Sequence, residues 1–276
     1  MDTILTQADN GIGYITLNRP DKLNYLSDEM FIALKQTIES WDNRDDVQVI
    51  ILRGNGKAFS SGFDVSSDPP TSVKEWLDQA ILENQAPYSF WGSEKPIIAQ
   101  VHGYCLGGAN SLVLSCDMII AAEDATFGEP EVRFGSISPF FMLPWMTHSK
   151  QAKELLLTGD RISAVEAKGL GLINKVVKRE DLEKETVYLA EKIKKNDQIT
   201  NGTIKYLTNQ MYDIRGFKES MHTAEEKFAM LMDSDRPEAN QFMKTITEKG
   251  FREAQRLRKL EITEGVEKSL LVQGRE

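Results

Sequence analysis

Two glutamates on either side of a proline, Glu129 and Glu131, lie in the segment ATFGEPEVRFG (125–135) and could do acid–base chemistry. The surrounding residues are otherwise largely apolar, and burial raises the pKa of a carboxyl group toward the range that suits a general acid or base. Taken alone, the segment is more typical of a loop with two solvated carboxylates. The pair therefore needs support from elsewhere in the chain.

Two adjacent glycines, Gly107 and Gly108, lie in GYCLGGANSLVLSCD (103–117), after an apolar run and at the start of a predicted helix. A helix N-terminus leaves backbone N–H groups that can bind an anion or a developing oxyanion, and glycine has no Cβ to block a ligand. The same glycines would also allow a strand to pack closely on a helix, and the motif alone favours neither interpretation. The segment lacks the G-x-G-x-x-G pattern of dinucleotide sites, and its helix holds no acid before Asp117.

A second glycine-containing loop, GNGKAFSSGFD (54–64), follows a predicted strand. It does not match a phosphate-binding P-loop, because the glycine spacing differs and Ala58 follows Gly56-Lys57. By itself this loop is typical of an ordinary turn in which Asp64 caps a helix.

The remaining reactive side chains predict no further chemistry. Ser111 lacks the G-x-S-x-G context of a serine nucleophile. The two cysteines match no metal or disulfide pattern and are expected to be buried thiols: Cys105 and Cys116. The three histidines lack the spacing of metal ligands, so no metal site is expected: His102, His148 and His222.

The elements that would position these residues alternate between apolar strands and helices. Strands are predicted over residues 11–20, 47–54, 95–103, 117–122 and 173–177. Helices are predicted over 27–42, 71–86, 108–116, 150–159, 163–171, 181–195, 199–213, 217–234 and 236–256. Buried strands that alternate with helices predict an α/β fold with parallel pairing, here a core over 1–195 followed by a helical region over 196–276.

Composition limits the classes of partner. The chain has 276 residues, 41% of them hydrophobic, which fits either one large domain or one domain with an appendage. A net charge of −9 argues against nucleic acid and anionic membranes as partners, although an anionic small ligand needs only a few local cations. The N-terminus lacks the features of a signal peptide, and no apolar stretch approaches the ~20 residues of a membrane span. A cytoplasmic setting is therefore expected.

Four segments, taken together in this order, closely resemble the crotonase superfamily, the enoyl-CoA hydratase/isomerase group. They are ITLNRPDKLNYLS, KAFSSGFDV, KPIIAQVHGYCLGGANSLVLSCDMIIAAEDATFGEPEVRFG and AKELLLTGDRISAVEAKGLGLINKVV. The resemblance implies a crotonase-like (ClpP/crotonase) spiral of ββα units that binds acyl-CoA, followed by C-terminal helices that form a homotrimer or homohexamer. It implies coenzyme A as part of a thioester substrate, with no tightly bound cofactor.

The resemblance also assigns one task to both glycine motifs. In the family, two backbone N–H groups polarise the thioester oxygen, and by position these match Phe63 and Gly108. Gain or loss of a proton at the α-carbon passes through an enolate whose charge collects on that oxygen. One preset donor in a comparable oxyanion hole contributes about 3 kcal/mol.

The acids depart from the family pattern. Enoyl-CoA hydratases of the family usually carry two glutamates, of which the second matches Glu131 and the first falls on Ser111. The leading interpretation is a hydratase of 2-enoyl-CoA with Glu131 as acid and base and Ser111 as a water-holding residue, as in the similar hydroxycinnamoyl-CoA hydratase-lyases. The alternatives are a Δ3,Δ2-enoyl-CoA isomerase with Glu131 as the sole proton shuttle, a thioester hydrolase or decarboxylase, and a non-catalytic acyl-CoA binder.

Substrate contacts follow from the same resemblance. Two lysines would pair with the phosphates of the nucleotide or, alternatively, be solvated, and the loop 56–64 would pass near the adenine. In GSISPFFMLPW (135–145), which replaces a glycine-rich segment, Phe140 would line the acyl group or, alternatively, pack the core beneath the site. The predicted substrate-binding residues are Lys22, Lys57, Ala58, Ser61, Asp64, Gly107 and Phe140.

Overall fold

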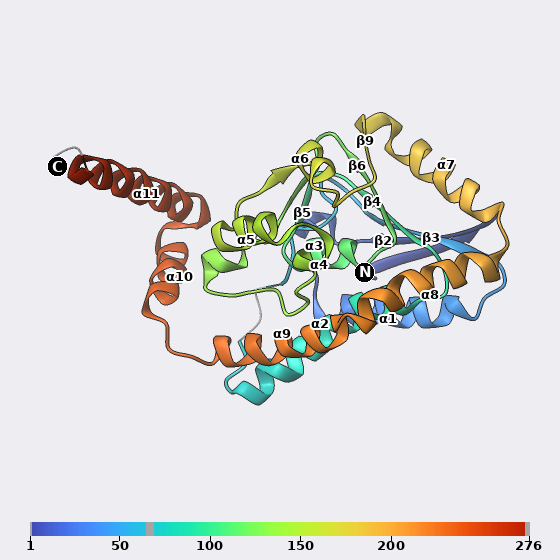
Figure 1. Ribbon diagram of the computed structural model, residues 1–276, viewed down its shortest axis with the longest axis horizontal. Helices are drawn as coiled ribbons and strands as arrows, with labels where there is room; N and C mark the ends of the chain where they lie inside the picture. Colours follow the sequence, from blue (N-terminus) through green and yellow to red (C-terminus); the bar gives the residue numbers. More distant parts are fainter. Residues whose placement is uncertain (1, 65–68, 274–276) are drawn as a thin grey trace. The chain divides into compact units, whose positions relative to one another are not determined.

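A six-stranded sheet forms the centre of the computed structural model, which describes residues 2–64 and 69–273 (Figure 1). The strand order is β1-β2-β3-β4-β6-β9, and only the β1–β2 pair is antiparallel. The strands are β1 (Ile4–Asp9), β2 (Gly11–Leu17), β3 (Val47–Gly54), β4 (Ile97–Val101), β6 (Met118–Ala122) and β9 (Lys175–Val177). The α/β class with parallel pairing is therefore confirmed.

A second, three-stranded sheet consists of β5 (Tyr104–Leu106), β7 (Thr126–Gly128) and β8 (Ile162–Ser163). β5 and β7 are parallel, and their last residues, Leu106 and Gly128, are register partners. The sequence patterns did not predict this sheet, because strands of two or three residues are too short to show an alternation. Its register matters for function, because the segments that follow both strands begin at the same sheet edge.

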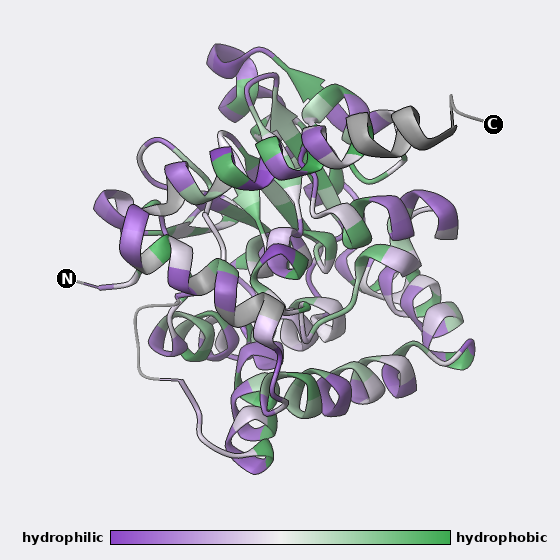
Figure 2. Ribbon diagram, turned by 90° about the vertical axis from the view of Figure 1, so that its left-hand side faces the viewer, coloured by the Kyte–Doolittle hydropathy of each residue, from purple (hydrophilic) through white to green (hydrophobic). Residues whose placement is uncertain are grey.

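Helices pack on both faces of the larger sheet, while further helices flank this core. They are α1 (Asp28–Asp42), α2 (Val73–Gly92), α3 (Gly108–Leu114), α4 (Leu143–Met146), α5 (Ser149–Thr158), α6 (Ala164–Gly169), α7 (Leu182–Lys194), α8 (Gln198–Ile214) and α9 (Phe217–Met232). Along β3, Val49 and Ile51 pack toward α7 on one face, whereas Ile50 and Leu52 belong to the larger core that includes α1 and α2 on the other. Figure 2 shows hydrophobic residues concentrated in the strands and hydrophilic residues spread over the helices.

The chain divides into two compact units, of which the first comprises Met1–Val132 and Ser136–Ser234. The second comprises Arg133–Gly135 and Asp235–Glu276 and holds α10 (Pro237–Lys249) and α11 (Phe251–Gln273). Helices α8 and α9 thus belong to the first unit, so the compact units divide near residue 234. The division at residue 195, which separates binding from oligomerisation, stays a prediction.

One predicted helix differs from the structure, and one predicted helix cap, Asp64, is not tested by it. The single helix predicted over 236–256 is wrong, because Gly250 adopts a φ of 81° and separates α10 from α11. The residues directly after Asp64 lie outside the described part of the chain. The next helix, α2, is capped by Ser72, whose Oγ accepts a hydrogen bond from the Glu75 amide at 3.3 Å.

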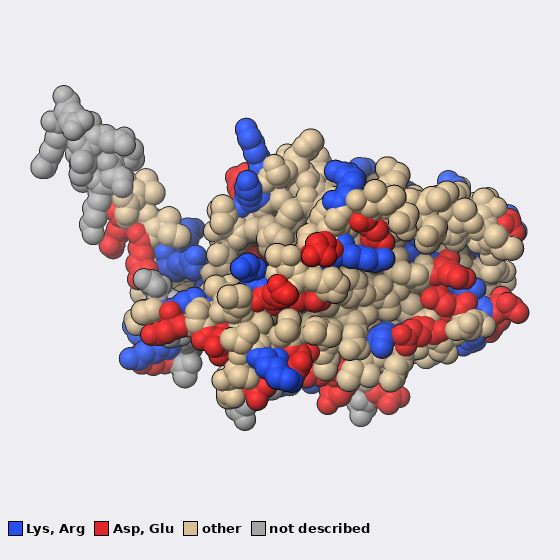
Figure 3. Space-filling view, turned by 60° about the horizontal axis from the view of Figure 1, so that its bottom comes forward, with Lys and Arg blue, Asp and Glu red and all other residues tan. Residues whose placement is uncertain are grey.

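Surface properties agree with the composition. On the face drawn in Figure 3, Lys and Arg side chains are interspersed with Asp and Glu. Within residues 2–64 and 69–273, no helix has the length and apolar character needed to cross a membrane.

A buried cation attaches α8 to the sheet. Lys205, 7% exposed, donates through Nζ to the carbonyl oxygens of Phe90 and Lys95 at 2.9 and 3.0 Å. Its Nζ also lies 2.9 Å from Asp117 Oδ2, which accepts the Ile97 amide at 2.7 Å. Burial raises the pKa of Asp117, and Lys205 partly offsets this effect. The ammonium group therefore stabilises a carboxylate that would otherwise be buried without a counter-charge.

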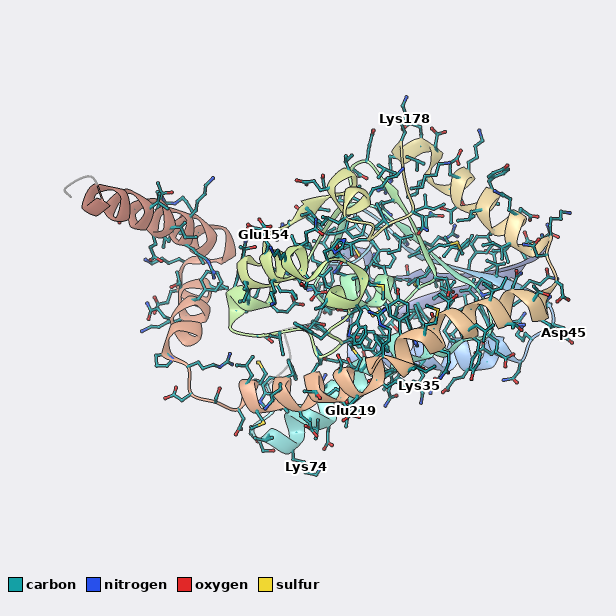
Figure 4. The ribbon with its side chains drawn as sticks, viewed as in Figure 1. Lys35, Asp45, Lys74, Glu154, Lys178 and Glu219 are labelled. Carbon is teal, nitrogen blue, oxygen red and sulfur yellow. The ribbon has the colours of Figure 1, made fainter. Side chains whose placement is uncertain are left out.

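Lys205→Met is expected to lower the free energy of unfolding at pH 7 by about 3–5 kcal/mol, because it leaves Asp117 buried without its partner. The matched control is Lys74→Met, since Lys74 pairs with Asp78 at 2.6 Å on the surface and its side chain is 83% exposed (Figure 4). The control is expected to change stability by about 0.3–0.5 kcal/mol. Urea denaturation measures both, and equal losses in the two variants would contradict the stabilising role of Lys205.

Candidate active site

The turn between β5 and α3 depends on the backbone conformation of Gly107. Its φ of 57° and ψ of −132° suit glycine alone, and its amide donates to the Gly128 carbonyl at 2.8 Å. A Cβ at this position would lie 2.5 Å from Oε1 of Glu131. The carboxyl group of Glu131 therefore lies directly against the backbone at the start of α3.

Two loops meet at this turn. A Cβ on Gly62 would lie 2.7 Å from the Leu106 carbonyl oxygen, and a Cβ on Gly108 would lie 2.5 Å from the ring of Phe63. The amide N–H groups of Phe63 and Gly108 donate to no acceptor among the residues that the structure describes. Gly108 is also the first residue of α3, where the helix dipole favours negative charge. The arrangement thus offers two backbone donors in adjacent segments.

Glu131 lies in a 3₁₀ turn, Pro130–Phe134. Both of its carboxylate oxygens are buried, and neither has a hydrogen-bond partner in the described part of the chain. Burial is the main cause that raises the pKa of Glu131, and the charge of Glu129 raises it further. A buried carboxyl group without donors is poised to exchange a proton with a bound molecule.

Glu129 is also buried, with 2% exposure, so the alternative that these two acids are solvated is wrong. Its Oε1 accepts hydrogen bonds from Asn110 Nδ2 at 3.0 Å and from Ser111 Oγ at 3.4 Å. Ser111 Oγ also lies 2.9 Å from Ser138 Oγ, which donates to the Phe140 carbonyl at 3.2 Å. Burial raises the pKa of Glu129, whereas the two donors lower it.

A third acid near the site, Glu83, comes from α2. Burial raises its pKa to about 8, while Gln79 donates to it at 3.0 Å and lowers the pKa. The charge of Glu83 is among the causes that raise the pKa of Glu131. Sequence reasoning missed Glu83, because an acid within an amphipathic helix is normally solvated and carries no signal of burial.

The predicted coenzyme A contacts lie on two adjoining loops. Asn24, fully buried, donates through Nδ2 to the carbonyls of Asn55, Ala58 and Phe59 at 2.7–3.1 Å. It therefore connects the segment that bears exposed Lys22 to the segment that bears exposed Lys57.

The other predicted contact residues on these loops are fixed in place by burial, a backbone hydrogen bond or an ion pair. Ala58 is buried at 1% exposure, and the Ser61 amide donates to the Leu23 carbonyl at 2.9 Å. Asp64 lies 3.6 Å from Arg19 in an ion pair. Sequence reasoning also missed Asn24. The only signal in the sequence is that asparagine is common in turns, and the structure shows Asn24 with a positive φ of 52°.

The remaining predicted residues are buried. Phe140 is 1% exposed and packs edge-on against Tyr88 and Phe217, with ring centroids 5.2 and 6.1 Å apart, so it belongs to the core. Its contact with an acyl group stays a prediction. Cys105 and Cys116 are free and buried, as expected.

Comparisons with known proteins agree with this architecture. Residues 7–253 match the model of a family described as enoyl-CoA hydratase/isomerase. A probable mitochondrial enoyl-CoA hydratase of Dictyostelium discoideum is 35% identical over 215 residues, which make up 77% of this chain and 77% of that protein. A short-chain-enoyl-CoA hydratase of Clostridium acetobutylicum is 31% identical over 245 residues, or 83% of this chain and 94% of that protein.

A solved structure shows the same fold. The crystal structure of an enoyl-CoA hydratase/isomerase from Xanthobacter autotrophicus matches with a TM-score of 0.89 and 34% sequence identity, and the match covers 94% of this chain and 98% of that one. The similarity thus extends over nearly the whole of both chains.

Proposed function

The chain belongs to the enoyl-CoA hydratase/isomerase family of the crotonase superfamily, and from this premise we propose that it is an enzyme that adds water to the double bond of a 2-enoyl-CoA thioester. The observation that carries the proposal is the buried Glu131 carboxyl group, which has no hydrogen-bond partner among the described residues and lies against Gly107. Its raised pKa supports a role in proton transfer.

The amides of Phe63 and Gly108 bind the thioester oxygen in this proposal. When the hydroxyl group of water bonds to the β-carbon, electrons shift toward the carbonyl and the oxygen gains negative charge. Two N–H groups that already lack acceptors stabilise this charge without reorganisation. Glu131 then delivers a proton to the α-carbon, which completes the addition of one water.

The coenzyme A part of the substrate lies along the loops that Asn24 connects. The ammonium groups of Lys22 and Lys57 pair with its phosphates, while the segment of Ala58, Ser61 and Asp64 borders the nucleotide. In this proposal coenzyme A enters and leaves as part of the thioester, and no cofactor is tightly bound. Assembly as a homotrimer or homohexamer and a cytoplasmic setting belong to the same proposal.

A second candidate is a Δ3,Δ2-enoyl-CoA isomerase, which is favoured by Ser111 at the position of the first family acid. In that reaction Glu131 alone moves one proton between two carbons, and no water is consumed. A non-catalytic binder accounts less well for the site, because a buried carboxyl group without donors costs stability and contributes nothing to binding an anionic ligand.

Product analysis separates the candidates. The protein is incubated with a short 2-enoyl-CoA and, separately, with the corresponding 3-enoyl-CoA, and the thioesters are resolved by chromatography with mass detection. We expect the 2-enoyl substrate to become a 3-hydroxyacyl-CoA. Conversion of the 3-enoyl substrate to the 2-enoyl thioester, with no hydration of either, would establish the isomerase instead. Binding of both substrates without any conversion would support the binder.

A further inference from the structure

Position 111 is a serine, yet an acid lies beside it. Ser111 Oγ donates to Glu129 Oε1 at 3.4 Å, and the same oxygen accepts Asn110 Nδ2 at 3.0 Å. Glu129 Oε2 is buried and has no partner within residues 2–64 and 69–273. Nothing in the proposed reaction has yet used this carboxyl group.

The fold brings Glu129 and Glu131 to one face of α3. The β5–β7 register and the hydrogen bond from Gly107 to Gly128 hold the start of α3 beside the segment that begins at Glu129. Glu131 lies against Gly107, and Ser111 follows four residues later, one turn along the same helix face. The contact between Ser111 and Glu129 therefore lies one helical turn from Glu131.

The hydrogen-bonded contacts around Ser111 outnumber the hydroxyl protons that could be donated in them by one. Three contacts run in series, from Glu129 to Ser111, then to Ser138, and then to the Phe140 carbonyl, which can only accept. Two hydroxyl protons can satisfy two of these contacts. When Glu129 is protonated, it can donate to Ser111, which donates to Ser138, which donates to the Phe140 carbonyl. The network can therefore exist either with Glu129 ionised or with Glu129 protonated.

We propose that Glu129 acts through Ser111 as the second carboxylate of the site, and that Glu129 and Glu131 share one proton in the resting enzyme. The inference rests on the proposed hydration. Glu129 is thus a positioning residue, because it reaches the reacting water only through the Ser111 hydroxyl group.

The proton balance of the step closes without an outside reagent. At the start Glu131 carries the shared proton and Glu129 is ionised. The oxygen of water bonds to the β-carbon, its proton passes to Ser111 Oγ, and Ser111 passes its own proton to Glu129. Glu131 gives its proton to the α-carbon. One water is consumed, and the proton returns from Glu129 to Glu131 by exchange once the product has left.

The electrostatics of the pair support this starting state. Burial raises the pKa of both carboxyl groups, and the negative charge of Glu129 further raises that of Glu131. Asn110 and Ser111 stabilise the ionised form of Glu129, whereas Glu131 has no such donors. Glu83 adds negative charge near Glu131 as well. The single proton therefore rests on Glu131.

Glu129→Gln separates hydration from chemistry at the α-carbon. The variant keeps an oxygen for Asn110 and Ser111 but cannot take a proton, so hydration of a 2-enoyl-CoA is expected to fall by about 10²–10⁴-fold in kcat with little change in KM. Exchange of the α-protons of a saturated acyl-CoA in deuterium oxide needs only ionised Glu131 and the two amides. It is expected to be retained or to become faster, because loss of the Glu129 charge makes Glu131 easier to ionise. The matched control is Glu225→Gln, because Glu225 is also buried and accepts an asparagine amide, Asn84 Nδ2, at 2.8 Å.

Loss of hydration with retained exchange supports proton transfer from water through Ser111 to Glu129. Ser111→Ala, measured in the same way, should also lose hydration and retain exchange. The double variant should then lose no more kcat than either single variant. Unchanged hydration in Glu129→Gln would overturn the proposal, and so would equal loss of hydration and exchange, because that result indicates a purely structural role. If the wild-type protein exchanges α-protons but hydrates nothing, the proposed function itself fails.

Discussion

Glu131→Gln is expected to hydrate 2-enoyl-CoA about 10²–10⁴-fold more slowly than the wild-type protein. The amide has nearly the shape of the carboxyl group, so the affinity for acyl-CoA should stay near normal, and the loss should fall on kcat. The physical reason is that the buried Glu131 carboxyl group lies against the turn before α3 and, in the proposed reaction, supplies the proton to the α-carbon. Steady-state kinetics and equilibrium binding of a saturated acyl-CoA measure the two quantities.

The stability of Glu131→Gln shows whether a loss of activity could come from unfolding. Because burial raises the pKa of Glu131 above its ordinary value of 4.5, the folded wild-type protein binds a proton more tightly than the unfolded chain. Wild-type stability therefore falls as the pH rises from about 4.5 through the raised pKa, by about 1.4 kcal/mol for each unit of difference, whereas glutamine has no such dependence. Glu131→Gln should thus be at least as stable as wild type at pH 8. Retained turnover in this stable variant would remove Glu131 from the mechanism.

The second large effect is expected from the amide of Gly108. Proline is tolerated at the first position of a helix, and at position 108 it would remove only an N–H group that has no acceptor within the described residues. Loss of one oxyanion donor costs about 10²–10³-fold in kcat. A side chain at this position would, however, meet the Phe63 ring at 2.5 Å, so the test belongs in a Phe63→Ala background.

The comparison is made between Gly108→Pro and Gly108→Ala in that shared background. Both add a Cβ, and only proline removes the amide hydrogen. We expect the alanine variant to retain most of the activity of its parent and the proline variant to lose it, with both showing the same helical circular dichroism. Equal kcat in the two would contradict the use of this amide as an oxyanion donor.

Much of the larger sheet could be predicted because its strands have strong local patterns. The run of β-branched residues over Val47–Gly54 has the bounds that the sequence indicated, and α1 ends at Asp42 as expected. The short strands β5, β7 and β8 carry no such pattern, and their pairing depends on contacts between distant segments. The break at Gly250 shows that a single glycine with a positive φ outweighed a continuous helical pattern.

The site was predicted chiefly by resemblance. The structure adds which of its residues lie close together and which are buried. It brings Phe63, Gly107, Gly108 and Glu131 together, although their roles remain predictions. Glu129 could not be predicted to be buried, because its burial depends on Asn110 and Ser111, which precede it by 19 and 18 residues. An acid in a loop is ordinarily solvated, whereas here the β5–β7 register places the segment that begins at Glu129 beside the start of α3.

The central claim, that the enzyme adds water, is tested most directly by mass spectrometry of the product formed in heavy-oxygen water. A 2-enoyl-CoA is incubated with the protein, and the recovered thioester is fragmented to locate the label. We predict a product that is heavier by one labelled water, with the heavy oxygen on the β-carbon of the acyl group. Recovery of an unlabelled thioester with a shifted double bond, or of unchanged substrate, would contradict the claim.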